Sequence, residues 1–142
     1  MMRLQLVTMT GVKLDESIYS ATIPTVDGEI SVFPSHESIV TVARNGVITV
    51  KFKENDPESK REYFAISGGI VHIDQTQIRI LVDEADHGDD IIEAETQAAL
   101  DRALKQRDEA GDQIEREKAH QLVDRHMVRL RVAELQRRKG RK

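Results

Sequence analysis

The sequence predicts an α+β protein, with a strand-rich β-sandwich over residues 1–85 and an antiparallel two-helix hairpin over residues 86–142. Up to about residue 85, apolar residues either alternate with polar ones or form short runs, and these runs are separated by residues typical of turns. After Asp89 the apolar residues recur every three or four positions, and no proline interrupts them. An acidic joint with five carboxylates, Asp83–Asp90, lies between the two parts. We therefore expect a part that docks and a part that can move.

Four strands are expected in the first half of the strand-rich part. They are Leu4–Thr8, Ser17–Ile23, Glu29–Phe33 and Ile39–Ala43. Pro24 and Pro34 end the second and third of them, because proline cannot donate a hydrogen bond to a neighbouring strand. The dipeptide Asp27-Gly28 is a turn signal between these two strands.

The dipeptide Asn45-Gly46 predicts a tight β-hairpin that joins Ile39–Ala43 to a strand at Val47–Phe52, because both residues tolerate positive φ. After a polar loop, three more strands are expected at Tyr63–Ile66, Ile70–Ile73 and Ile78–Val82. Gly68-Gly69 between two of them predicts a bulge or a close approach of two backbone segments. Roughly eight or more short strands at this spacing favour a β-sandwich or a flattened barrel.

The helical part divides into two helices. Asp89 and Asp90 mark the expected start of the first, because carboxylates stabilise a helix N-terminus, and Gly111 ends it. Asp112 and Glu115 have the spacing of a capping box, which predicts the start of the second helix. The expected apolar stripes are Ile91, Ile92, Ala98, Ala99, Ala103 and Leu104 on the first helix, and Ala119, Leu122, Val123, Met127, Leu130 and Ala133 on the second. These stripes are narrow and rich in alanine, so their burial supplies only a modest free energy. We therefore expect the docked and undocked states of the hairpin to be close in free energy, as a switch requires.

Charge is distributed unevenly along the chain, whose net charge is −4. Residues 1–85 carry 8 basic and 12 acidic side chains, residues 86–111 carry 3 and 8, and residues 112–142 carry 10 and 5. Only the last segment is cationic, so we expect it to meet an acidic partner. The lack of cysteine excludes disulfides and thiolate chemistry. No apolar run has the length of a signal peptide or a membrane span, which predicts a soluble or peripheral protein of a reducing compartment.

No group of residues has the pattern of a catalytic or metal site. The five histidines are scattered, and His120 and His126 do not share a helix face well. The Ser67-Gly68-Gly69 turn lacks the lysine and the following helix of a P-loop. Nucleic-acid binding is disfavoured, because the cationic segment has no aromatic residue for base stacking and the chain is acidic as a whole. An adaptor with a basic helical tail is kept as an alternative.

Several segments, taken in order, resemble the epsilon subunit of F-type ATP synthases. The main one is Ile23–His36, which has Ser31 and Ser35 where that family typically has glycine. The others are Leu6–Thr8, Asn45–Val47, Phe64–Gly69, Ile80–Ala85 and Arg131–Leu135. Because the resemblance runs over nearly the whole chain, the protein is identified as a member of this family, whose fold is a β-sandwich of about ten strands followed by a two-helix hairpin.

The resemblance implies a non-catalytic rotor subunit of a bacterial, proton-translocating F-type ATP synthase, without an active site of its own. It implies that the sandwich contacts the gamma subunit and the membrane c-ring, and that the hairpin either lies on the sandwich or extends toward the catalytic alpha and beta subunits and inhibits ATP hydrolysis. The protein would lie at the cytoplasmic face of the inner (plasma) membrane, held there through the complex. Glu29 and His36 fall on positions that contact the c-ring and the gamma subunit in similar proteins.

Three arginines of the second helix are candidate contacts of an extended hairpin: Arg125, Arg129 and Arg131. Arg125 and Arg129 are four residues apart and so lie on one helix face, where they can bind a carboxylate or a phosphate.

The family's ATP-binding members carry two arginines at the positions of Arg125 and Arg129, together with an acidic residue that Asp86 preserves. Their motif at the start of the first helix is absent here. Ile92, Glu95 and Thr96 stand where its Asp, Arg and Ala would be, and the carboxylate of Glu95 would repel a triphosphate. We therefore expect no cofactor, and an ATP-sensing subunit with a nucleotide bound by the hairpin is the alternative.

Overall fold

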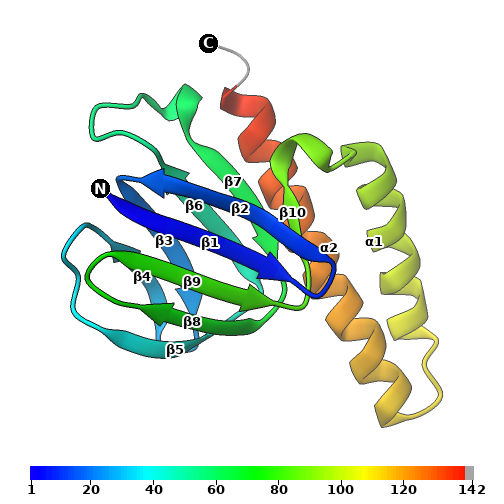
Figure 1. Ribbon diagram of the computed structural model, residues 1–142. Coiled ribbons are helices and arrows are strands. Elements are labelled where there is room, and N and C mark those ends of the chain that lie inside the picture. Colours follow the sequence, from blue (N-terminus) through cyan, green and yellow to red (C-terminus); the bar gives the residue numbers. More distant parts are fainter. Residues whose placement is uncertain (140–142) are drawn as a thin grey trace.

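The computed structural model describes residues 1–139 and has a curled β-sheet with a helical hairpin along one side (Figure 1). The ten strands are β1 (Met2–Thr8), β2 (Gly11–Ile18), β3 (Ser20–Thr25), β4 (Gly28–Val32), β5 (Ile39–Ala43), β6 (Gly46–Lys51), β7 (Glu62–Ile66), β8 (Gly69–Ile73), β9 (Gln77–Val82) and β10 (Ala85–His87). Two short 3₁₀ turns, η1 (Glu58–Lys60) and η2 (Gly88–Asp90), precede β7 and the first helix. The helices are α1 (Glu93–Asp108) and α2 (Gln113–Lys139). The prediction of a β-sandwich followed by a two-helix hairpin is confirmed; residues 140–142 of the expected hairpin segment lie outside the described residues.

The strands follow the order β10-β7-β6-β3-β5-β8-β9-β1-β2, and β4 pairs with β3 beside this path. All pairs are antiparallel except β1 with β9. β10 also contacts β1 and β2, so the two ends of the sheet approach each other and the sheet nearly closes. β10 spans the expected boundary between residues 85 and 86, and its three residues pair with Phe64, Ala65 and Ile66 of β7.

The core of the sandwich follows from the alternation of side chains along each strand. In β1 the side chains of Leu4 and Leu6 are fully buried, whereas Arg3 before them is exposed and Gln5 between them is partly exposed. β9 repeats this pattern with Ile78 and Ile80 inside. The buried core cluster draws only on residues 2–85, so the sandwich has a core that does not depend on the helices.

The hairpin predicted at Asn45-Gly46 is wrong. β5 and β6 do not pair with each other, because β3 lies between them in the sheet. Neither Asn45 nor Gly46 has positive φ. The Asn45 side chain instead accepts a hydrogen bond from the Gly68 backbone N–H (2.8 Å), and a Cβ on Gly46 would lie 2.8 Å from the Pro24 side chain. These contacts between distant segments override the local turn signal.

The strand predicted at Ser17–Ile23 is divided in the structure. β2 ends at Ile18 and β3 begins at Ser20, so the chain changes strands at Tyr19. β2 starts as early as Gly11, although most of its side chains are polar and exposed. An edge strand buries few of its side chains, which is why hydrophobic alternation did not reveal it.

The close backbone approach expected at Gly68-Gly69 is confirmed, because a Cβ on Gly69 would lie 1.9 Å from the Leu81 carbonyl oxygen.

The helix start expected at Asp89 is four residues too early, because Asp89 and Asp90 belong to η2 and α1 begins at Glu93. The capping signal of α2 is confirmed: the Asp112 carboxylate accepts the Glu115 N–H (2.8 Å), and the Glu115 carboxylate accepts the Gly111 N–H (3.1 Å).

The expected apolar stripes are only partly correct. Ile92 and Ala98 are exposed, and Thr96 and Leu100 are buried in their place. On α2, Met127 is 55% exposed and Val132 is fully buried. The reason is that α2 has two covered faces, one against α1 and one against the sheet, so a single stripe does not describe it.

Candidate functional site: the interface between helix α2 and the sandwich

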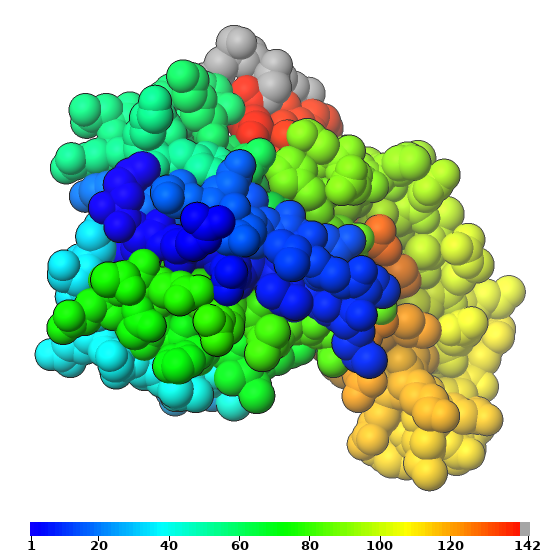
Figure 2. Space-filling model, viewed as in Figure 1, coloured from blue at the N-terminus to red at the C-terminus, as the bar shows by residue number. Residues whose placement is uncertain are grey.

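The C-terminal half of α2 lies against β6 and β7, while α1 packs on its other side (Figure 1). Figure 2 shows that the loop end of the hairpin extends beyond the sandwich. The apolar part of the interface is a small cluster separate from the sandwich core, with Tyr63, Ala65, Ile91, Val132 and Ala133 buried in it. Burial raises the pKa of the Tyr63 hydroxyl. A cluster of this size, which includes two alanines, supplies a modest hydrophobic stabilisation.

Four charged residues connect α2 to the acidic joint that follows the sandwich. They are Glu84 and Asp86 of the joint and Arg125 and Arg129 of α2, and we call them the charged cluster. The Arg125 guanidinium lies 3.2 Å from the Glu84 carboxylate, and Arg129 Nε lies 3.4 Å from Asp86 Oδ2. The first pair is hydrogen-bonded, whereas the second is an ion pair without hydrogen-bond geometry. The four side chains are between 30% and 53% exposed. Each pair therefore contributes on the order of 1 kcal/mol or less.

Further polar contacts hold the last turns of α2. Gln136 donates to the Asp89 carboxylate, and Arg137 lies 3.7 Å from the Glu93 carboxylate. The Lys139 ammonium donates to the backbone carbonyl of Arg61. The polar part of the interface thus consists of several weak contacts rather than one strong one.

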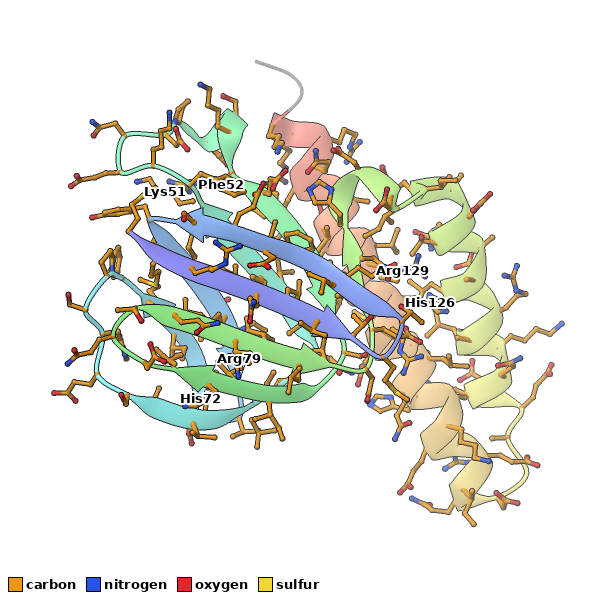
Figure 3. The ribbon with its side chains drawn as sticks, in the orientation of Figure 1. Lys51, Phe52, His72, Arg79, His126 and Arg129 are labelled. Carbon is orange, nitrogen blue, oxygen red and sulfur yellow. The ribbon has the colours of Figure 1, made fainter. Side chains whose placement is uncertain are left out.

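His126 lies on α2 beside the charged cluster, as Figure 3 shows together with Arg129. Its Nδ1 is buried and has no hydrogen-bond partner among residues 1–139. Desolvation lowers the pKa of this imidazole below its ordinary value of 6.5, and the positive charges of Arg129, Arg125 and Arg102 lower it further, while Glu84 acts in the opposite direction. Burial and the neighbouring arginines both favour the neutral form of His126.

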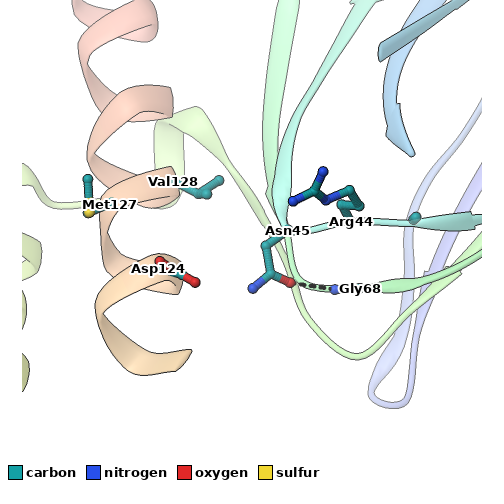
Figure 4. A pocket seen from close by; sticks show the side chains of 7 residues that line it. Arg44, Asn45, Gly68, Asp124, Met127 and Val128 are labelled. Carbon is teal, nitrogen blue, oxygen red and sulfur yellow. Dashed lines mark hydrogen bonds between the residues drawn. The ribbon is translucent and has the colours of Figure 1, made fainter. Parts of the chain in front are cut away.

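Two hollows adjoin this interface. The first lies within the charged cluster and has a volume of only about 10 Å³, which is room for one water molecule. The second is a groove of about 510 Å³ between α2 and the loop that joins β5 to β6 (Figure 4). Its walls carry Arg44 and Asn45 on the sandwich side and Asp124 and Met127 on the helix side. At this groove the axis of α2 diverges from the sheet.

The structure places Glu29 and His36 at opposite ends of β4. Glu29 is exposed and pairs with Pro24 near the start of the strand. His36 follows the strand, and its Nδ1–H donates to the Glu37 carbonyl (2.7 Å). Ser35, next to His36, has φ of 68°, a left-handed conformation in which glycine is favoured.

The structure brings Asp86, Arg125 and Arg129 together, whereas Arg131 stands apart from them. Its side chain is 57% exposed and lies 4.0 Å from Glu134 on the same helix.

A row of apolar side chains on the outer face of the sheet was missed by sequence reasoning. Val42 of β5 is opposite Ile70, Ile70 is opposite Leu81, Leu81 is opposite Val7, and Val7 is opposite Val12. We call these five residues the apolar row; Val42, Ile70, Leu81 and Val12 are 50%, 53%, 49% and 62% exposed. The available signal was that β5, β8 and β9 carry branched apolar residues on both faces. A continuous exposed apolar surface is typical of a docking site.

Among residues 1–139 no helix is long and apolar enough to cross a membrane, and no group of side chains has the composition of a metal site.

Comparison with known proteins identifies the family. Residues 1–88 match the family described as ATP synthase, Delta/Epsilon chain, beta-sandwich domain. The ATP synthase epsilon chain of Herpetosiphon aurantiacus is 32% identical over 139 residues, which is 95% of this chain and 96% of that protein. The chain belongs to the ATP synthase delta/epsilon family. The epsilon chain of Chloroflexus aggregans is 31% identical over 93% of this chain and 91% of its own length.

Two solved structures share the fold of this epsilon-type chain. A chain in the Euglena gracilis mitochondrial ATP synthase structure, described as OSCP/F1/c-ring, aligns with a TM-score of 0.76 at 23% identity, covering 89% of this chain and 77% of that one. A chain in the central stalk/c-ring structure from Tetrahymena thermophila aligns with a TM-score of 0.58 at 15% identity, covering 93% and 96%. The family resemblance expected from the sequence is confirmed, and it places the chain in a class of non-catalytic ATP synthase subunits.

Proposed function

We propose that this epsilon-type chain is a non-catalytic rotor subunit of a proton-translocating F-type ATP synthase, which docks through its sandwich and restrains ATP hydrolysis through its hairpin. The observation that carries the docking role is the apolar row on an outer face of the sheet, in a chain of this family. The gamma subunit in the central stalk is the proposed occupant of this face. Glu29 and His36, at the two ends of β4, are the proposed contacts to the c-ring and the gamma subunit.

The inhibitory role rests on the hairpin's separate packing. Its contacts with the sandwich are few and partly exposed, so the helices can leave while the sandwich core stays intact. Release would free Arg125 and Arg129 from Glu84 and Asp86, and would leave both arginines, with Arg131, available to acidic residues of the catalytic alpha and beta subunits. In a bacterium, such a subunit lies at the cytoplasmic face of the inner membrane and is held there by the complex.

Ile70→Glu tests the docking role. The substitution introduces a charge at the centre of the apolar row, on a side chain that is 53% exposed, so the fold should tolerate it while an apolar partner should not. We expect affinity for the cognate gamma subunit to fall about tenfold or more in a pull-down or calorimetric measurement. Ile114→Glu is the matched control, because Ile114 is 67% exposed at the start of α2. Equal binding by the two variants would reject the apolar row as the docking surface.

We propose further that docking of the hairpin needs no bound nucleotide, because Glu84 and Asp86 take the positions at Arg125 and Arg129 that a phosphate would need. The hollow of about 10 Å³ between them has no room for a triphosphate. Calorimetric titration of the full chain with Mg-ATP at millimolar concentration is therefore expected to give no binding heat. Saturable heat that Arg129→Gln removes would instead support an ATP-sensing subunit.

A further inference from the structure

A second row of side chains runs beside the apolar row on the outer face of the sheet. Its members are opposite one another across β5, β8, β9, β1 and β2, and we call them the polar row: Val40, His72, Arg79, Gln5 and Asp15. Figure 3 shows His72 and Arg79 on this sheet, away from the helical hairpin. A partner that covers the apolar row therefore meets mostly polar groups on one side of it.

Arg79 has no ionic partner in the folded chain. No carboxylate oxygen of residues 1–139 lies within 4.0 Å of its guanidinium nitrogens. Asp15, in the same row, is already paired with Arg3 at 2.6 Å. Asp74 lines a shallow hollow with Arg79, but its Oδ1 accepts three hydrogen bonds from its own turn. The Arg79 side chain is exposed, so in the free chain water solvates its charge.

The opposite side of the apolar row carries a negative charge. Asp83 follows Leu81 by two residues, is exposed, and lines a hollow of about 260 Å³ together with Leu81 and Val7. Within the described part of the chain, no cationic side chain lies within 4.0 Å of its carboxylate. The apolar row is therefore flanked by a free guanidinium on one side and a free carboxylate on the other.

Arg79 lies close enough to the apolar row to be covered together with it. It is two residues from Leu81 on the same strand and the same face, which corresponds to about 7 Å. The apolar row crosses five strands and is therefore about 19 Å long. A stable protein–protein interface covers about 800 Å² on each partner, a patch roughly 15 Å in radius. A partner centred on the apolar row thus removes Arg79 from much of its water.

A covered guanidinium needs a hydrogen-bond acceptor from the partner. Without one, the loss of hydration at Arg79 would oppose binding. Arginine pairs well with a carboxylate, because the two carboxylate oxygens match two of its N–H groups. A partner carboxylate on the other side of the row would meet Asp83 and be repelled.

We propose that the gamma-subunit surface which docks on the apolar row has an apolar ridge and, about 7 Å to one side of it, a carboxylate that pairs with Arg79. Arg79 thereby sets the orientation of the partner, because only one way of laying the ridge along the row brings this carboxylate to the guanidinium rather than to Asp83. Burial of the apolar row supplies affinity, and the charges on its two sides supply specificity. This role of Arg79 rests on the proposed docking of the gamma subunit.

Calorimetric affinity of the full chain for the cognate gamma subunit tests the role of Arg79. Arg79→Glu should weaken binding about a hundredfold, because it places two carboxylates against each other. Arg79→Leu should weaken binding about tenfold, because the partner's carboxylate is then covered without a donor. Arg116→Glu is the matched control, since it makes the same change of charge at an exposed position of α2, and it should bind as the unmodified chain does.

The sign of the Arg79→Leu effect separates two kinds of partner surface. A leucine at this position extends the apolar row, so a partner that is apolar there would bind the variant more tightly. Equal or tighter binding by Arg79→Leu would therefore overturn the role of Arg79. The docking role of the apolar row would stand in that case, provided that Ile70→Glu weakens binding and Ile114→Glu does not.

Charge exchange identifies the carboxylate of the partner. Each aspartate and glutamate of the gamma subunit is changed in turn to lysine, and binding to the Arg79→Glu chain is measured. One such substitution should restore the affinity to within about threefold of the unmodified pair and should weaken binding to the unmodified chain. If none restores it, or if Arg116→Glu weakens binding as much as Arg79→Glu, the role of Arg79 is wrong. Absence of binding between the two unmodified proteins would overturn the docking role and the role of Arg79 together.

Discussion

A chain that ends after His87 is expected to raise ATP hydrolysis by the assembled ATP synthase about fivefold or more, the scale of a coupling free energy of roughly 1 kcal/mol. The sandwich core uses only residues up to Ala85, so loss of both helices leaves it packed. Ending at His87 rather than at Ala85 keeps β10 paired with β7. The measurement is the rate of ATP hydrolysis by purified complex that contains either the full or the shortened chain, with rotor assembly and ATP synthesis measured in parallel.

Val132→Asp is a control for which we expect the opposite change in the rate of ATP hydrolysis. Val132 is fully buried between α2 and the sandwich, and a carboxylate there should expel the hairpin without removing it. Met127→Asp puts the same charge on a side chain of α2 that is 55% exposed, and it should have little effect. If an extended hairpin inhibits, Val132→Asp lowers hydrolysis whereas truncation raises it. An unchanged rate in the truncated complex would remove the inhibitory role from the proposed function.

Gly69→Ala is expected to destabilise the sandwich by about 3 kcal/mol or more, at the upper end of what one added methyl group costs. Gly69 lies in β8 between Ala43 of β5 and Val82 of β9. A Cβ at this position would lie 1.9 Å from the Leu81 carbonyl oxygen and 2.8 Å from Val82 Cα. These are backbone atoms of a neighbouring strand, so β9 would have to move away. Urea unfolding followed by far-ultraviolet circular dichroism measures the loss in the free energy of unfolding.

Gly111→Ala is the matched control for this substitution. A Cβ at Gly111 meets only the flexible Glu115 carboxylate, at 3.7 Å, and the residue does not have positive φ. Its free energy of unfolding should change by about 0.5 kcal/mol or less. Similar midpoints for the two variants would mean that the sheet adjusts at Gly69 more easily than the approach of the two strands indicates.

Local patterns were reliable where the structure depends on neighbours in the sequence. The pattern of Leu4–Thr8 correctly indicated a strand, and its side chains alternate between the two faces of the sheet. The capping box at Asp112 and Glu115 forms as expected, since its bonds join residues three or four apart.

Local patterns failed where another segment provides the decisive contact. Asn45-Gly46 has the composition of a tight hairpin, yet β3 separates the two flanking strands. The one-stripe description of α2 failed for a related reason, because Val132 packs on the sheet while Val123 packs on α1. This helix is buried on two sides because of where the sandwich lies, and the helical period of the sequence does not indicate the position of the sandwich.

The candidate site shows the same division. The spacing of Arg125 and Arg129 was sufficient to put them on one helix face, but only the folded chain decides that Glu84 and Asp86 face them, across 41 residues of sequence in the first pair. The apolar row likewise joins residues from five strands, and its continuity exists only in the register of the sheet.

The sequence by itself determined the two-part layout, the cap of the second helix and the family, because each depends on short-range periodicity or on ordered motifs. The tertiary structure alone decided the strand order, the apolar row on the outer face of the sheet, and the position of His126 near Arg102, Arg125, Arg129 and Glu84. The physical reason is that these features arise from packing between distant segments, whose free energy is set by the whole fold rather than by any local pattern.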